Sequence, residues 1–310
     1  MNKKQAVLFF LVFGGLACFN LMMHDKGGTI AMLAVIILGL LFLLFPTAHP
    51  SGETERLLSD EEETTDNGEE PGKKALTYYG NELNFSDQEL TTVLIKHLPF
   101  FKMLNTEQKE KFLQRLNIFI DEKIYYIHDE SGFKEMPILI SATAVQLSFG
   151  LEKYLLPNFN CIHIYPEEFI GVHPSIRLLE GNVSGHSINL SWKHFLQGFL
   201  FPYDGQNVGL HEFAHAYYYQ YFETGESVDK TFVASFPDFN NNSSQVLKQE
   251  QSPGYDLYSD YGLSNEQEFW AESVELFFEK PIQLKSAYPV LYDALKRLWK
   301  QDPAENKCEL

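Results

Sequence analysis

The sequence predicts a helix-dominated α+β domain with a small sheet, preceded by a two-helix transmembrane hairpin and a linker. Two long uncharged apolar segments near the N-terminus indicate the hairpin. Apolar residues at helical spacing through most of the later chain, and short β-branched alternating segments between residues 160 and 190, indicate the α+β domain. We therefore divide the chain into a hairpin at 1–46, a linker at 47–75 and a globular domain at 76–310.

The hairpin rests on two segments that are each long enough to cross a bilayer. Residues 5–23 and 29–45 carry no charged side chain, and Gly27, Gly28 and Pro46 mark the turn and the end. A membrane-spanning helix needs about 20 apolar residues, with a range of roughly 17–25. A cleaved signal peptide is the alternative for the first segment, but no small-x-small cleavage site follows it and a second apolar segment comes at once. We predict two spans that contact the lipid bilayer.

Flanking charges predict the orientation of the hairpin. Lys3 and Lys4 precede the first span, whereas Lys26 is alone in the turn. The positive-inside rule then puts the N-terminus, and with two spans the rest of the chain, in the cytoplasm. We expect an integral protein of a bacterial-type inner membrane whose globular domain is cytoplasmic. The linker holds nine acidic and three basic residues, which favours a disordered, extended tether.

The charge and cysteine content exclude several classes of protein. The chain has 24 Lys+Arg against 42 Asp+Glu, a formal net charge of −18, so it lacks the basic surface that nucleic-acid binding requires. Cys18, Cys161 and Cys308 are too few and too scattered for a disulfide framework or a cysteine-based zinc cluster.

Local signals predict the elements of the globular domain. Ser86 opens a capping box, and Asn105 or Thr106 begins a second helix. Further helices are expected at 138–151, 190–200, 207–222, 265–279 and 282–299, and strands at 160–165, 175–179 and 186–190, the last two separated by 180–182. The segment 223–258, with the polar run 240–244, is expected to be a loop that lines the cleft.

One motif indicates the chemistry. His211, Glu212 and His215 form HExxH on a predicted helix. Residues four apart lie one turn apart on one helix face, so both imidazoles can bind a single Zn²⁺. Glu212 lies beside them, where a carboxylate can accept a proton from a zinc-activated water.

A catalytic zinc needs a third protein ligand, and a later helix offers acids for it. Position 221 is tyrosine, so a histidine six residues beyond His215 is absent. Glu268, Glu272 and Glu275 instead recur on one stripe of an apolar helix, where burial is costly without a cation. We expect one ligand and one acid that orients a ligating imidazole, and the spacing alone does not choose among the three.

Several ordered segments resemble the zinc-dependent peptidases of the Mlc titration factor A (MtfA) family. The resemblance covers roughly residues 105–303. Its segments are IYPEEF at 164–169, LSW at 190–192, NVGLHEFAH at 207–215, EFWAESVELFFEKP at 268–281, YPVLY at 288–292 and QDP at 301–303. The chain departs from the family pattern at 216–219, where Ala-Tyr-Tyr-Tyr follows the motif.

The resemblance implies a zincin-like, gluzincin-type fold with one catalytic Zn²⁺. It implies that Glu268 is the third metal ligand and that Tyr261, seven residues earlier, donates a hydrogen bond to the transition state. We add Glu272 as the candidate acid that orients an imidazole.

These observations predict a membrane-anchored zinc peptidase that hydrolyses peptides or proteins with Glu212 as general base. The sequence leaves open whether it acts as an aminopeptidase or an endopeptidase. The alternative is a regulatory binding protein that sequesters a protein partner, with its zinc structural or weakly catalytic. An intact HExxH favours the enzyme, because a scaffold need not retain the base.

Overall fold

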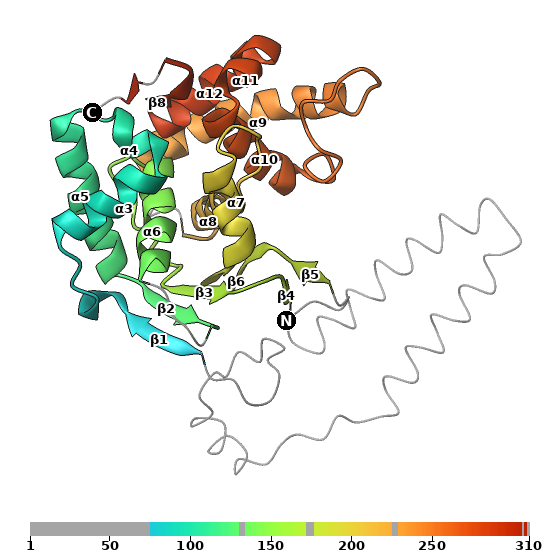
Figure 1. Cartoon of the computed structure of the whole chain (residues 1–310). Helices are drawn as coiled ribbons and strands as arrows, with labels where there is room; N and C mark the ends of the chain where they lie inside the picture. Colours follow the sequence, from blue (N-terminus) through green and yellow to red (C-terminus); the bar gives the residue numbers. More distant parts are fainter. Residues whose placement is uncertain (1–74, 130–133, 172–176, 225–228, 306, 309–310) are drawn as a thin grey trace, which may run out of the picture. The chain divides into compact units, whose positions relative to one another are not determined.

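A five-stranded sheet with helices packed on one face forms the framework of the computed structural model (Figure 1). The structure describes residues 75–129, 134–171, 177–224, 229–305 and 307–308. The predicted hairpin at 1–46 and all but the last residue of the predicted linker at 47–75 lie outside these ranges. Within these ranges, no helix is both long and apolar enough to traverse a bilayer.

The sheet has three parallel central strands and two antiparallel edge strands. Its order is β1 (Leu76–Tyr79), β2 (Ile124–Ile127), β3 (Cys161–Tyr165), β7 (Ser187–Ser191) and β6 (Gly181–Ser184). Alternate residues such as Ile162, Ile164, Ile188 and Leu190 are buried, as expected when one face packs on helices. Among the described strands, β6 pairs only with β7, so β6 is an edge.

The expected strand pair is present, but its boundaries differ from the prediction. The segment 180–182, predicted as the connection, contains the start of β6, and the turn lies at Gly185 instead. Gly185 has a φ of +54°, which glycine adopts readily in a tight hairpin turn. The residues 178–179, predicted as part of this pair, form β5 (Leu178–Leu179), which pairs with β4 (Phe169–Ile170) in a separate ribbon.

Helices dominate the remainder, which confirms the predicted helix-rich α+β class. Ser86 and Asn105 each complete a capping box at the predicted helix starts. The helices are α3 (Asp87–His97), α4 (Pro99–Met103), α5 (Thr106–Asp121), α6 (Glu135–Leu147), α7 (Trp192–Leu200), α8 (Val208–Thr224), α9 (Lys230–Glu250), α10 (Glu266–Glu279), α11 (Pro281–Ala287) and α12 (Pro289–Trp299).

The helix α9 corrects the prediction of a loop at 223–258. Asp229 caps its first turn by accepting a hydrogen bond from the backbone N–H of Thr231 at 2.7 Å. Phe232, Phe236 and Phe239 recur at helical spacing and are buried, and α9 packs mainly against α12. The asparagine-rich run dominates the composition of this segment, but the apolar spacing determines its structure.

The single helix predicted at 282–299 is instead two helices. Proline has no backbone N–H and clashes with the preceding turn, so Pro289 ends α11 and begins α12.

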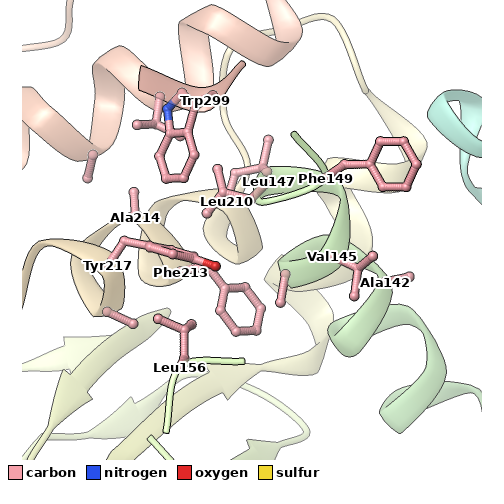
Figure 2. Packing of buried hydrophobic residues seen from close by; sticks show 14 of the residues in the cluster. Ala142, Val145, Leu147, Phe149, Leu156, Leu210, Phe213, Ala214, Tyr217 and Trp299 are labelled. Atoms are coloured by element: carbon pink, nitrogen blue, oxygen red, sulfur yellow. The ribbon is translucent and has the colours of Figure 1, made fainter. Parts of the chain in front are cut away.

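The helix α8 lies at the centre of the apolar core. Leu210, Phe213 and Tyr217 recur on one face of α8 and are buried. Figure 2 shows them among residues of α6, such as Val145, with Trp299 of α12 beyond. This packing fixes the orientation of α8, and therefore the direction in which its opposite face points.

Candidate active site

The helix α8 carries the HExxH motif and begins at a side-chain cap. Asn207 Oδ1 accepts a hydrogen bond from the backbone N–H of Leu210 at 3.0 Å, and the Asn207 carbonyl accepts one from His211 N at 2.9 Å. The apolar residues face the core, while His211 and His215 lie together on another side of the helix. Their rings are 4.7 Å apart between centroids.

The structure brings His211, His215 and Glu268 to a common point. Glu268 Oε2 lies 3.0 Å from His211 Nε2 and 3.3 Å from His215 Nε2, and the two Nε2 atoms are 3.1 Å apart. Glu268 belongs to the first turn of α10, where Asn265 Oδ1 accepts hydrogen bonds from the backbone N–H groups of Gln267 and Glu268. These three residues form the one potential metal-binding group found among the described residues.

The spacing of these three atoms fits a zinc ion. Zinc binds imidazole nitrogen and carboxylate oxygen at about 2.0–2.1 Å in a tetrahedral arrangement, so two of its ligand atoms are about 3.3 Å apart. The observed separations of 3.0–3.3 Å agree with that value. Two imidazoles and one carboxylate also match a donor set used by catalytic zinc.

Glu275 orients the imidazole of His211, which corrects the expectation for Glu272. Glu275 Oε1 is 2.7 Å from His211 Nδ1, and Glu275 Oε2 accepts a hydrogen bond from the backbone N–H of Asn207. Seven residues bring Glu275 back to within about 20° of Glu268 around the helix, whereas Glu272 is about 40° away on the other side. The i+7 spacing was the signal in the sequence for this role.

Glu272 instead holds the loop that precedes α10. Its carboxylate accepts hydrogen bonds from the backbone N–H and the hydroxyl of Ser259, at 2.7 and 2.8 Å. A Cβ atom at Gly262 would lie 1.6 Å from Glu272 Oε2, so the loop requires glycine there to approach the helix. Glu272 therefore positions the segment that carries Tyr261.

The charges of this cluster stabilise one another. Burial opposes protonation of His211, but Glu275 and Glu268 raise the pKa of His211 well above its usual value. Burial would raise the pKa of Glu268, but hydrogen bonds from His211 and His215 lower that pKa below its usual range. Burial lowers the pKa of His215. The surrounding carboxylates therefore favour a positive charge at the point where His211, His215 and Glu268 converge.

Glu212 is buried beside the histidines and keeps a free acceptor. It is 5% exposed, and its Oε2 atom has no hydrogen-bond partner within the described residues. Burial raises the pKa of Glu212 to about 8; His211 opposes this rise, while Glu268 and Glu275 add to it. A Cβ atom at Gly181 on β6 would lie 2.6 Å from Glu212 Oε1, so this glycine makes room for the carboxylate.

Tyr261 lies at the open side of the cluster. Its side chain is 62% exposed, and its ring centroid is 6.3 Å from that of His211. Partial burial of the hydroxyl and a hydrogen bond with Glu268 raise the pKa of Tyr261 above its usual value. The phenol therefore remains a hydrogen-bond donor at neutral pH, next to the point where the side-chain atoms of His211, His215 and Glu268 converge.

A hydrogen bond joins α8 and α10, the two helices that carry His211, His215 and Glu268. The indole Nε1–H of Trp270 on α10 donates to the backbone carbonyl of Ala214 on α8 at 2.8 Å, and both residues are buried. The sequence did not predict this contact or the contact of Gly181 with Glu212, because each joins segments that are far apart in the chain.

Comparison with known proteins gives one family. The model of the glucose-regulated metallo-peptidase family M90 matches residues 81–300, which is well over half of this chain and includes all the residues described above. The uncharacterized protein slr2042 of Synechocystis sp. is 25% identical over 236 residues, covering 69% of this chain and 84% of that protein. The family match confirms the resemblance and extends further toward the N-terminus than residue 105.

Proposed function

This chain belongs to the glucose-regulated metallo-peptidase M90 family, and from that premise we propose that it is a zinc-dependent peptidase of the gluzincin type. Its ligands are His211 and His215 on α8 and Glu268 on α10. The convergence of their three atoms, with pairwise distances of 3.0–3.3 Å, is the observation that carries this proposal. A zinc ion there supplies a Lewis acid and lowers the pKa of water toward 7.

Glu212 is the general base in this proposal. A Zn²⁺ bound to the two histidines would favour the ionised form of this buried carboxylate, and its free oxygen beside them supports proton transfer from the attacking water. Glu212 then delivers that proton to the leaving amine as the peptide bond breaks. A positioned acid–base group contributes about 10²–10⁴-fold to a reaction rate.

Two further residues complete the proposed catalytic centre. The Tyr261 hydroxyl donates a hydrogen bond to the carbonyl oxygen as negative charge develops on it, and its raised pKa keeps the proton on the phenol. Glu275 holds His211 Nδ1 at 2.7 Å and so directs Nε2 toward the metal.

The edge strand β6 supports an extended peptide as the substrate. It has an unpaired edge among the described strands, and Gly181 on this strand packs directly on Glu212. An extended peptide can add to such an edge through main-chain hydrogen bonds, which would align its scissile bond with the base. We therefore propose peptide or protein substrates bound in extended form.

We also propose that residues 5–23 and 29–45 anchor the enzyme in a bacterial-type inner membrane with its catalytic domain in the cytoplasm. The support is the pair of uncharged segments and the Lys3–Lys4 bias in the sequence. Reporter fusions at the C-terminus test this: an active cytoplasmic reporter is expected, and an active periplasmic reporter would contradict the orientation.

Metal analysis combined with a peptide-library digest tests the peptidase proposal. One zinc per chain and chelator-sensitive cleavage are expected. Glu212→Gln should keep its zinc and lose about 10²–10⁴-fold in activity, whereas Glu268→Ala should lose stoichiometric zinc.

The controls distinguish the enzyme from the alternative function. Zinc binding without cleavage of any library peptide would favour the regulatory binding protein. Full activity in Glu212→Gln would contradict the general base, and stoichiometric zinc in Glu268→Ala would contradict the third ligand.

A further inference from the structure

A cavity of about 540 Å³ lies beside the first turn of α8 and is separate from the candidate active site. Residues of α4, α7, α10, α11 and the segment 301–304 line it, together with Asn207 and Leu210. His211, Glu212, His215, Tyr261 and Glu268 do not line it. Its volume is in the range of about 300–1,000 Å³ that small-molecule sites occupy.

Aromatic, aliphatic and polar side chains all line the cavity. Phe100, Phe199 and Phe278 line the cavity from three different helices. Met103, Tyr203 and Ile282 also line it but are 55%, 72% and 61% exposed, so they form its rim at the surface. The three phenylalanine rings offer contacts to an apolar ligand body.

The charges that line the cavity are acidic. Glu279 and Asp302 line it, and no lysine, arginine or histidine does so among the described residues. Asp302 is already neutralised, because Lys296 Nζ lies 2.6 Å from its carboxylate. Of these two carboxylates, Glu279 is therefore the one with no cationic partner among the described residues.

Glu279 is buried with neutral hydrogen-bond donors only. It is 6% exposed, and its two oxygens accept hydrogen bonds from Asn207 Nδ2 at 2.8 Å and from the backbone N–H of Gly205 at 3.1 Å. Burial raises the pKa of Glu279 to about 8, and the nearby Glu275 and Asp204 add to that rise. Glu279 is therefore largely protonated at neutral pH, and an ammonium ligand would favour its ionised form, because a buried charge that is paired costs less than an unpaired one.

We propose that this cavity binds a small organic cation: an amine on an aromatic or aliphatic body. The ammonium group pairs with Glu279, and the body packs against Phe100, Phe199 and Phe278. Aromatic faces attract cations, and a charge-assisted hydrogen bond is about twice as strong as a neutral one, so both features of the cavity select the same chemistry.

Three probes with one apolar body test the charge preference. Tryptamine, tryptophol and indole-3-propionate carry an ammonium, a hydroxyl and a carboxylate on the same indole. Titration calorimetry on the full-length protein should give tryptamine an affinity about tenfold or more above that of tryptophol, with indole-3-propionate weakest. Equal affinities, or no binding of tryptamine, would overturn the proposal.

A matched pair of surface variants locates the binding. Ile282 on the rim is 61% exposed, and Val290 outside the cavity is 60% exposed. Ile282→Arg places a cation at the opening and should weaken tryptamine binding about tenfold or more, whereas Val290→Arg should leave it unchanged. An equal effect of the two variants would mean that tryptamine binds elsewhere.

Glu279→Gln tests the pairing directly. It should remove the preference for tryptamine over tryptophol, and a preference that persists would overturn the role of Glu279. The introduced amide could replace only one of the two accepted hydrogen bonds, so the variant's fold is checked by circular dichroism. The Ile282→Arg and Val290→Arg pair decides the question if this variant does not fold. All these measurements follow binding without hydrolysis, so their outcome is independent of the peptidase proposal.

Discussion

The two faces of α8 are built on opposite physical principles. One face consists of Leu210, Phe213 and Tyr217, packed into the apolar core on the side of the helix shown in Figure 2. The other face presents His211 and His215 to carboxylates at hydrogen-bond distance. Burial of the first face stabilises the folded state, whereas the second face holds charges in an environment that favours a cation.

The difference between the two faces shows how a site can hold several carboxylates close together. Burial raises the pKa of Glu212 to about 8, and the nearby carboxylates of Glu268 and Glu275 add to that rise. Such an arrangement is stable only if the surrounding core fixes the helices, because the acidic groups would otherwise separate into water. The apolar face therefore provides the stability and the polar face provides the chemistry.

Truncating Phe213 on the apolar face should give the largest effect. Phe213→Ala creates a cavity between α8 and its neighbours and should lower the free energy of unfolding by about 3–5 kcal/mol. Phe222→Ala is the matched control, because the same substitution on the same helix removes a ring that is 59% exposed. Chemical denaturation of both variants measures the difference, and equal losses would contradict the division between the faces.

Removing the Tyr261 hydroxyl should affect catalysis but not folding. Tyr261→Phe is expected to lower kcat about 10²-fold, with zinc content and thermal stability unchanged, because the ring is exposed and the hydroxyl acts on the substrate. Tyr255→Phe, on the same loop, should retain activity. An equal loss in the two variants would show that the loop, rather than the Tyr261 hydroxyl, is responsible.

Two glutamates of α10 should separate metal binding from loop positioning. Glu275→Ala removes the partner of His211 Nδ1 and should weaken zinc binding about 10–100-fold. Glu272→Ala releases Ser259 and should lower kcat while zinc affinity is kept. Competition with a zinc chelator measures both affinities, and the reverse result would restore Glu272 as the residue that orients the imidazole.

A smaller effect should come from a histidine on neither face of α8. Burial, with His128 adding to it, lowers the pKa of His163 on β3 to about 4. The unfolded chain, with a histidine pKa of about 6.5, then binds the proton first as the pH falls. Acidification from about pH 7 to 5.5 should therefore cost about 1 kcal/mol of stability through His163.

His163→Phe is the variant for this measurement. It retains a ring to stack on Tyr126, whose centroid is 4.5 Å away, but cannot titrate. Denaturation of the zinc-loaded protein at the two pH values should show a smaller acid effect in this variant. An unchanged acid effect would assign it to groups other than His163.

The sequence predicted the elements that local signals specify. The capping box at Ser86 and the start expected at Asn105 or Thr106 agree with two observed helix starts, and the HExxH spacing predicted that His211 and His215 would share one side of a helix. These features depend on hydrogen bonds and periodicity within a few residues of each other.

The errors arose where distant contacts decide the outcome. Residues 230–250 form a helix because Phe232, Phe236 and Phe239 are buried against other helices, a contribution that the polar run at 240–244 concealed. Likewise, Glu272 and Glu275 have the same chemistry, and their different spacing from Glu268 did not by itself show which of them meets His211. The strands β1 and β2 are four residues each and were not predicted, because so short a segment has little periodicity.

The hydrogen bond from Trp270 to Ala214 limits how far α8 and α10 can move apart. Because the indole of α10 holds the backbone of α8 inside the core, the two helices would have to break a buried hydrogen bond to move apart. The three atoms that we propose as zinc ligands thus lie on two helices that are fastened to each other in the core. The loop that carries Tyr261 is held by the carboxylates of Glu250 and Glu272 and by the buried ring of Tyr258, which stacks on Phe269. We therefore expect the spacing of the three atoms to stay unchanged when a substrate binds.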